Sequence, residues 1–407
     1  MFRTTCKIAW ASLARRRTRS VLLVLMIAVS LTGLLLMEGI YEGMTEQMIS
    51  NAIRSDSGHL SIFGKGYRLE PDLSRILKDS EPIEALLRDD SRVKSYVKRL
   101  KQDGLVATAH YSRGASIIGI DPETENRHGR LGGYLHQGEY NFGKRQRGAI
   151  IGYKLADKLQ VRIGSKLIVS AQDINGEVSS SPHRVTGILK TNNMALDEYA
   201  VFLSEKQIRK LLGMKSGFSQ VSILLHNEAQ TGSLQKELQA TITDADVQRW
   251  DQLYPALLQS RVMMEGFNLV TNLLIFCVAA LGIFGVMLVS VLERLREFGI
   301  MKAIGTSFSE VRNIILVESF TMGFVGYGLG ALVGFASLYY FKVYGLDLTV
   351  FGEAFEEFGL DAVTYALIRP SYFVTALIAV IIAILLSVII PLRVIHKSKP
   401  IDTINAI

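Results

Sequence analysis

The chain has 407 residues, of which 49% are hydrophobic and 20% charged, with a mean hydropathy of +0.25 and a formal net charge of +7. This composition excludes an intrinsically disordered or collagen-like protein. The apolar residues are concentrated in four segments without a charged residue, each 18 to 27 residues long: 20–37, 266–292, 319–341 and 370–392. About 20 helical residues cross a hydrocarbon core, so the sequence predicts four transmembrane helices and excludes a purely soluble protein.

The first apolar segment, 20–37, allows two interpretations. It follows a basic cluster at Arg15–Arg19, as the core of a signal peptide would. We favour an uncleaved anchor, because the segment is longer than a usual signal core and no Ala-x-Ala cleavage site follows it. Cys6 and Cys277 both lie outside 38–265. That long region is therefore expected to fold without disulfide bonds.

Basic residues that flank the four segments predict the orientation of the chain. Residues 1–19 contain six bases and no acid, which places the N-terminus in the cytoplasm. Bases also accumulate in 293–318 and in 393–407, whereas acids outnumber bases in 342–369. Four crossings then place both termini in the cytoplasm and the short 342–369 loop outside. The positive net charge is thereby explained by topology, and no nucleic acid partner is expected.

The predicted fold class is a membrane protein with four transmembrane α-helices and a large extracytoplasmic α+β domain, 38–265, inserted between the first two. Residues 1–19 are predicted to form an amphipathic helix at the lipid interface, with an unstructured basic tail as the alternative. We expect residues 38–54 to continue the first spanning helix up to the turn at Ser55–Gly58. A helix from about Asp251 is expected to run directly into the second span.

Inside the domain, short β-type runs alternate with helical stretches. The predicted strands are His59–Phe63, Leu105–His110, Ser116–Ile120, Lys166–Ser170, Arg184–Ile188, Tyr199–Leu203 and Val221–Leu225. The predicted helices are Ile83–Leu87, Lys154–Leu159 and Glu205–Leu212, the last with Ser204 as N-cap and Gly213 after its end. Asn175-Gly176 is typical of a hairpin turn between two of the strands.

A search for catalytic chemistry gives no candidate. Gly64-Lys65 and Gly143-Lys144 are not followed by Ser or Thr, so neither continues as a Walker A loop. His128, His136 and Glu139 are close in sequence, but their spacing fits no zinc signature. We interpret them as part of a glycine-rich surface loop. The chain is therefore predicted not to be an enzyme and to bind no cofactor or metal itself.

Glycines recur on one side of the third apolar segment. Gly326, Gly330 and Gly334 are four residues apart, and Gly323 precedes them. Such spacing creates a helix face on which another backbone can approach closely. Two partners are equally compatible with this pattern: the chain's own helices, or a second permease subunit.

The segment between the second and third apolar segments, 293–318, contains a run with mixed charge and two glycines, Glu293 to Gly305. Its spacing predicts a short helix that begins at Glu293 and lies across the membrane face, with charged residues outward and apolar residues inward. A second amphipathic turn, Ser309–Val317, is expected to lead into the next span. The spacing alone is equally compatible with a helix that docks into a soluble partner and with a solvated loop.

The same run resembles a segment of the MacB/FtsX/LolCE-type ABC transporter permeases. Those proteins carry Glu-Arg-x-Arg-Glu-x-Gly-x-x-x-Ala-x-Gly after their second span. The matching residues are Glu293, Arg294, Arg296, Glu297, Gly299, Ala303 and Gly305. The resemblance extends over nearly the whole chain and includes its layout, the segment Ile150–Leu159 and the closing Pro391–Asp402.

The resemblance implies that 293–305, with Lys302, is a coupling helix that contacts a separate ATPase dimer, which would hold ATP and Mg. It also implies a permease dimer, of like or unlike subunits, in a bacterial inner membrane. Motion caused by ATP hydrolysis would pass to the periplasmic domain by mechanotransmission. No substrate channel of the usual kind is expected.

Members of the family differ in what this motion accomplishes. The layout is most similar to permeases that release lipoproteins, with a lipoprotein or a periplasmic carrier as partner. A signal transducer that regulates cell-wall hydrolases and a tripartite efflux permease are the alternatives. In lipoprotein-releasing members a protruding hairpin grips the carrier, and the corresponding segment here, Ala171–His183, is shorter and has one proline, Pro182.

Overall fold

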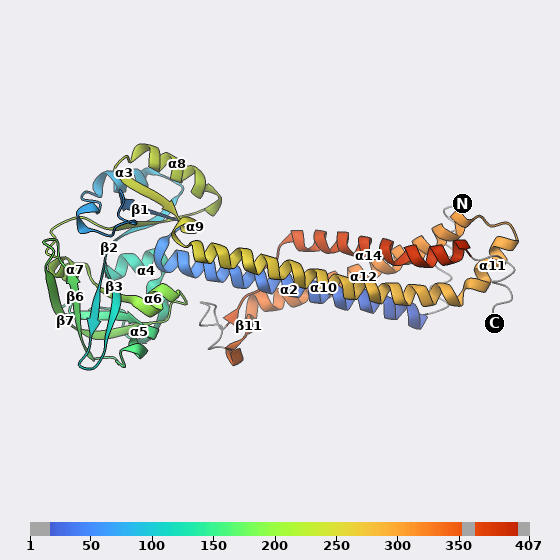
Figure 1. The fold of residues 1–407 in the computed structure, drawn as a ribbon, viewed down its shortest axis with the longest axis horizontal. Helices are drawn as coiled ribbons and strands as arrows, with labels where there is room; N and C mark the ends of the chain where they lie inside the picture. The colour runs from blue at the N-terminus through green and yellow to red at the C-terminus, as the bar shows by residue number, and fades with distance from the viewer. Residues whose placement is uncertain (1–16, 352–362, 398–407) are drawn as a thin grey trace. The chain divides into compact units, whose positions relative to one another are not determined.

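The computed structural model describes residues 17–351 and 363–397 (Figure 1). The chain forms two compact units. The helical unit combines the chain up to Thr45 with Arg261–Leu348 and the chain from Val363 onward. The α/β unit is built mainly from Glu46–Ser260. The predicted amphipathic helix at 1–19 lies almost entirely outside the described residues, as does most of the predicted tail.

Four long apolar helices are found in the described part of the chain, and each is long enough to span a membrane. They are α2 (Arg17–Ala52), α10 (Pro255–Glu293), α12 (Phe308–Tyr344) and α14 (Pro370–Lys397). The prediction that the first span continues past residue 37 is confirmed, because α2 runs to Ala52 and a π-helical turn, η1 (Ile53–Ser57), follows it.

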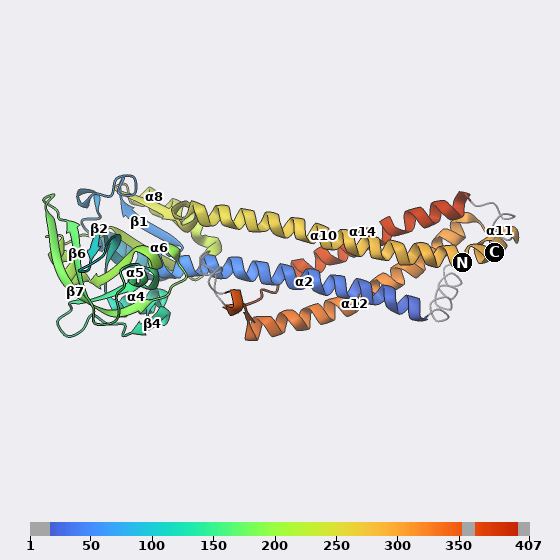
Figure 2. The ribbon, with the colours of Figure 1, turned by 60° about the horizontal axis from the view of Figure 1, so that its bottom comes forward.

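Helices α2 and α10 run side by side in the helical unit, as Figures 1 and 2 show. Thr45 donates a hydrogen bond to the Sδ atom of Met264 at 3.3 Å, and Gly282 packs against Met26. These two contacts define an antiparallel pair. The main core of this unit joins α2, α10, α12 and α14 through buried aliphatic side chains, among them Ile283 and Met322.

The α/β unit is organised by a ten-stranded mixed sheet. Along the sheet the strands follow the order β10-β1-β9-β2-β3-β8-β5-β7-β4, and β6 pairs with β2 and β7. The strands are β1 (Leu60–Gly64), β2 (Val93–Ala107), β3 (Ser112–Ile120), β4 (Leu135–Gly138), β5 (Gly148–Gly152), β6 (Lys166–Gln172), β7 (Val178–Leu189), β8 (Ala200–Ser204), β9 (Gln220–Leu225) and β10 (Ala245–Arg249).

The α-helices described in this unit are α3 (Glu81–Asp89), α4 (Pro122–Gly129), α5 (Tyr153–Lys158), α6 (Met194–Tyr199), α7 (Glu205–Leu211), α8 (Thr231–Thr241) and α9 (Trp250–Leu253). Short 3-10 turns occur at Leu73–Arg75, Leu131–Tyr134, Glu228–Gln230 and Thr349–Phe351. A two-stranded sheet joins β11 (Leu346–Asp347) to β12 (Val363–Thr364).

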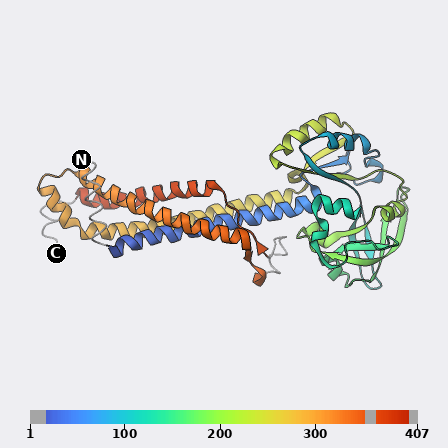
Figure 3. The ribbon, with the colours of Figure 1, turned by 180° about the vertical axis from the view of Figure 1, so that it is seen from behind.

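The long strand β2 links two parts of this unit, which Figure 3 shows from behind. Its first half pairs with β9, and Tyr96 packs against the core beneath α3 and α8. Its second half pairs with β3 and β6, and Leu100 and Val106 belong to the larger core. One strand therefore contributes to two hydrophobic cores.

Most predicted elements of the domain are confirmed, and several bounds are corrected. The strand expected at Leu105–His110 is only the end of β2, which begins at Val93. Asn175-Gly176 does lie in the turn that joins β6 to β7, with Gly176 at φ +84°. The helix expected from Asp251 is interrupted at Tyr254, which lies between the end of α9 at Leu253 and the start of α10 at Pro255.

Candidate functional site: the segment between α10 and α12

A short helix, α11 (Leu295–Ala303), connects α10 to α12. The expected start at Glu293 is wrong by two residues, because Glu293 ends α10 and Arg294 adopts a non-helical backbone. Gly305 follows α11 with φ +98°, a conformation that favours glycine. Ser307 and Glu310 then form a reciprocal capping box that begins α12.

Arg294 is not on the outer surface, contrary to the expectation that the charged residues of this segment point outward. Its Nη1 atom donates to Glu318 Oε2 at 2.8 Å, and its Nε atom donates to Glu297 Oε2 at 3.1 Å. Glu318 belongs to α12 and is buried. The guanidinium therefore ties the start of α11 to a neighbouring spanning helix.

Two further contacts hold α11 against the helical unit. Phe298 is 1% exposed and packs in the core with Val311 of α12 and Ile395 of α14. Lys302 donates from Nζ to the backbone oxygen of Ile395 at 3.1 Å. Gly299 is buried beside Phe298. The Arg294 ion pair, the buried Phe298 ring and the Lys302 hydrogen bond together fix one side of α11.

The other side of α11 is exposed. Arg296, Glu297 and Ala303 are exposed there. Ile300 is 47% exposed, and Ile304, which follows the helix, is 78% exposed. Residues four apart lie on the same side of a helix, so the two isoleucines form a small apolar surface with charges beside it. This combination of a fixed side and an exposed side is suited to contact with another protein.

The four glycines of α12 pack within the chain. A Cβ atom on Gly330 would lie 2.8 Å from the backbone oxygen of Ala28 in α2. Gly326 and Gly334 face other side chains of α2, and Gly323 faces Ile384 of α14. Thr32 donates to the backbone oxygen of Gly330 at 3.2 Å, which is consistent with close backbone approach. Of the two partners weighed for this face, the chain's own helices occupy it.

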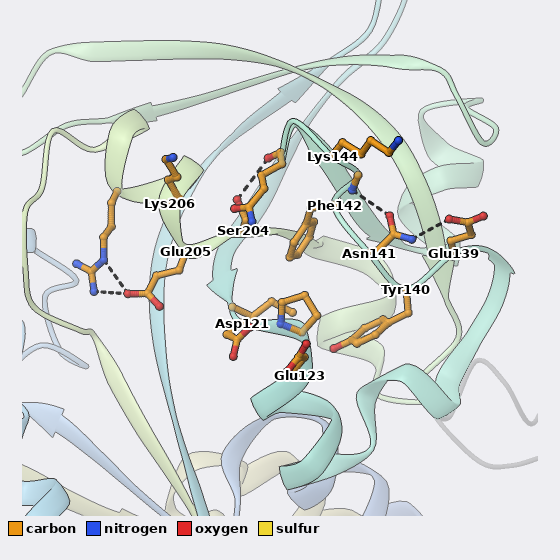
Figure 4. Close-up of a pocket in the computed structure, with 15 residues that line it drawn as sticks. Asp121, Glu123, Glu139, Tyr140, Asn141, Phe142, Lys144, Ser204, Glu205 and Lys206 are labelled. Carbon is orange, nitrogen blue, oxygen red and sulfur yellow. Dashed lines mark hydrogen bonds and ion pairs between the residues drawn. The ribbon is translucent and has the colours of Figure 1, made fainter.

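Figure 4 shows a second candidate site, a pocket of about 990 Å³ in the α/β unit that sequence reasoning missed. It lies where the parallel strands β3 and β8 end and lead into α4 and α7, a position at which sheets of this kind often bind ligands. Its charged lining residues are Asp121, Glu123, Lys144, Glu139, Glu205, Lys206 and Arg209. Glu205 and Arg209 pair at 2.8 Å, so the pocket carries both signs of charge.

The interpretation of His128 as part of a surface loop is wrong. His128 lies in α4, is 5% exposed, and contacts the hydroxyls of Ser95 at 2.9 Å and Ser222 at 3.2 Å. Burial and the nearby charge of Arg99 lower the pKa of His128 to about 3. Within the described residues, no group of three side chains is arranged to hold a metal ion.

The segment corresponding to the carrier-gripping hairpin is compact. Strands β6 and β7 pair from Lys166 opposite Arg184 to Gln172 opposite Val178, and residues 173–177 close the turn. Pro182 lies inside β7 opposite Ile168. The hairpin is therefore almost entirely paired strand.

Comparison with known proteins connects both units to one family. Residues 20–241 match the MacB-like periplasmic core domain, and residues 269–400 match the FtsX-like permease C-terminal family. Lipoprotein-releasing system transmembrane protein LolE of Haemophilus influenzae is 18% identical over 339 residues, which cover 81% of this chain and 77% of LolE.

Other relatives match over shorter segments. An uncharacterized ABC transporter permease of Methanocaldococcus jannaschii is 25% identical and covers 46% of each chain. Macrolide export ATP-binding/permease protein MacB 1 of Yersinia pestis is 25% identical over 42% of this chain and 28% of its own. The chain thus spans about half of the archaeal permease and less of MacB.

Among solved structures, the periplasmic region of MacB from Actinobacillus actinomycetemcomitans covers 50% of this chain and 95% of its own, at 15% identity and a TM-score of 0.35. The two family models together match residues 20–241 and 269–400, which include the strands of the α/β unit up to β9, α11 and most of the four apolar helices. The chain belongs to the MacB/FtsX/LolE-type family of ABC transporter permeases.

Proposed function

We propose that this chain is the permease subunit of an ABC transporter in which a separate ATPase dimer binds α11 from the cytoplasm. The observation that carries the proposal is the two-sided character of α11. Arg294 and Phe298 fix one side of it to the helical unit, while Ile300 and Ile304 are exposed on the other. Force applied to the exposed side would be transmitted to α12 and α14 through the buried side.

In this proposal ATP and Mg are held by the partner, and the chain contributes no catalytic residue. Members of the family work with ABC ATPase subunits, which supports a partner of this kind. The permease would pair with a second permease subunit in a bacterial inner membrane, with both termini cytoplasmic. The basic residues in 293–318 support that orientation.

We propose lipoprotein release toward the outer membrane as the work done by the transporter. The support is the extent of the match to LolE, which covers 81% of this chain, whereas the match to MacB 1 covers 42%. Mechanotransmission from α11 to the α/β unit would deliver the energy of ATP hydrolysis in the partner. The compact β6–β7 hairpin offers only a short surface to a periplasmic carrier, so the proposal does not include carrier binding at this hairpin.

Co-expression with candidate ATPase subunits tests the docking part of the proposal. We expect one ATPase to co-purify, and expect Arg296→Ala together with Ile304→Ser to abolish co-purification while the chain remains folded. Ile163→Ser, a change at a 44% exposed isoleucine of the α/β unit, is the matched control. Retained co-purification in the α11 variant would contradict docking at α11.

Cargo is tested separately. A photocrosslinker placed on the α/β unit of the active transporter should trap lipoprotein if release is the function. Crosslinks to a hydrolase and none to lipoprotein would instead support a signal transducer.

A further inference from the structure

The α/β unit is connected to the spanning helices at two points, and the two points meet. At the first, α2 ends and η1 carries Asp56. At the second, α9 ends and Tyr254 precedes α10. The hydroxyl of Tyr254 donates a hydrogen bond to Asp56 Oδ2. A side-chain contact thus joins residues 198 positions apart in sequence.

Asp56 is also held from the sheet. Lys101 of β2 donates from Nζ to Asp56 Oδ1, and Arg99 of β2 lies 3.2 Å from the same oxygen. Arg99 Nη1 donates in addition to the backbone oxygen of Asp56. Both carboxylate oxygens of Asp56 are therefore used, one toward Tyr254 and one toward β2.

Arg99 is the buried centre of this arrangement. It is 2% exposed, and it donates from Nε and Nη2 to the two oxygens of Glu125 in α4, at 2.5 and 2.7 Å. Glu125 itself is 1% exposed. Arg99 thereby connects α4 to the turn that follows α2. We call these five residues, Asp56, Arg99, Lys101, Glu125 and Tyr254, the helix clasp.

Stability alone is a poor reason for such an arrangement. Removing charges from water costs several kcal/mol per ion, and apolar replacements of buried ion pairs are often neutral or stabilising. What a fully hydrogen-bonded buried network provides is a single geometry. Burial and the charge of Asp56 raise the pKa of Tyr254 well above its usual value, so its hydroxyl keeps the proton that it donates.

We propose that the Asp56–Tyr254 contact holds the end of α2 and the start of α10 in one fixed relation to each other and to the sheet. A displacement of either helix would then act on the α/β unit at a single point. The consequence for transport rests on the proposed function, whereas the fixed geometry does not. Asp56 and Tyr254 are positioning residues that act through the two helices.

Distance measurement between spin labels tests the fixed geometry. Cysteines replace Glu46 and Gln259, both exposed residues of the α/β unit, in a full-length chain that carries Cys6→Ser and Cys277→Ser. We expect one narrow distance distribution. Tyr254→Phe should at least double its width, because the variant removes only the oxygen that binds Asp56. Tyr111→Phe, at an exposed tyrosine, is the matched control and should change nothing.

Two more variants separate the Asp56–Tyr254 contact from the rest of the helix clasp. Lys101→Met alters the same network but leaves the Asp56–Tyr254 contact, so the distribution should stay narrow. Asp56→Leu combined with Lys101→Met breaks the contact without leaving an unpaired lysine, and should broaden the distribution as Tyr254→Phe does. An unchanged width in Tyr254→Phe, or equal broadening in Lys101→Met alone, would overturn the proposal.

The functional consequence has its own readout. In the assembled transporter, Tyr254→Phe should keep ATP hydrolysis within twofold of wild type and lower lipoprotein release at least tenfold. If Tyr254→Phe broadens the distance distribution but the wild-type transporter releases no lipoprotein, the proposed cargo is refuted. The proposed geometry of the Asp56–Tyr254 contact is then still supported. Wild-type release by Tyr254→Phe would refute the role of the clasp in transport.

Discussion

Arg294 and Glu318 form an ion pair of 2.8 Å, and each side chain is only 9% exposed. The pair joins the residue just before α11 to the first third of α12. Because both charges are shielded from water, separating them would leave each charge buried and uncompensated, at a large cost in free energy. The ion pair therefore holds the start of α11 against the first third of α12.

Arg294→Ala is expected to lower the free energy of unfolding by about 3 to 5 kcal/mol, because it leaves the Glu318 carboxylate buried and unpaired. The measurement is thermal or denaturant unfolding of the full-length chain in detergent. Arg294→Leu combined with Glu318→Leu removes both charges and should be close to neutral. Equal destabilisation by the single and the double variant would contradict this account.

Ile304→Asp is expected to weaken ATPase binding at least tenfold, because a charge would enter an apolar contact surface. Binding is measured by titration of the purified ATPase onto the permease in nanodiscs. Since Ile304 is 78% exposed, the unfolding transition should stay within the error of the wild type. A variant that binds normally would place the docking surface away from the end of α11.

Gly330→Ala is expected to destabilise the helical unit by about 1 to 3 kcal/mol, the usual range for overpacking. The new methyl group would meet the backbone of Ala28, at 2.8 Å from its oxygen and 2.9 Å from its Cα. Gly328→Ala is the matched control, since no atom lies within 4 Å of its added carbon. Higher helix propensity should make that control neutral or slightly stabilising. If both variants unfold alike, close packing at Gly330 is refuted.

The stabilising contribution of His128 to the α/β unit should decrease below about pH 6.5. His128 is buried, and its pKa is lowered to about 3, so its neutral form is preferred in the folded state. The contribution of His128 to the free energy of unfolding is complete above its unfolded-state pKa of about 6.5. It is lost as the pH falls toward 3, at up to about 1.4 kcal/mol per pH unit.

Asp197 opposes this trend. Its burial raises its pKa to about 6, so its contribution is present below about pH 4 and is lost as the pH rises through 6. Fluorescence of Trp250 in a Trp10→Phe background follows unfolding of the unit, since the chain has two tryptophans. Compared with the wild type, His128→Gln should lose less free energy of unfolding between pH 6.5 and 3, because it lacks the imidazole that must take up a proton. An equal loss in both proteins would show that His128 does not carry it.

Elements that bury apolar side chains were predictable from sequence. The four spans, and strands such as β8 and β9, present continuous or alternating apolar residues. The continuation of α2 beyond the hydrocarbon core was also predictable, because the turn residues Ser55–Gly58 are the first helix-breaking cluster after it.

Elements that bury charge were not predictable in this way. Helix α4 has the sequence PETENRHG, and the residues that it buries are Glu125, His128 and Gly129. The first half of β2 buries Arg99, which no alternation of apolar and polar residues reveals. A pattern of apolar and polar residues assigns charged side chains to the surface. Their burial is explained only by an oppositely charged side chain from elsewhere in the chain, as Glu125 is for Arg99. The same limit applied to Arg294.

Strand β1 has both of its neighbours far ahead in the sequence, β9 at Gln220–Leu225 and β10 at Ala245–Arg249. During synthesis, nearly all of the unit must therefore leave the ribosome before both edges of this first strand can be covered. Strand β10 ends only six residues before α10 begins. Closure of the sheet thus coincides with emergence of the second spanning helix, so a truncated chain that stops before Ala245 would expose an uncapped strand edge to aggregation.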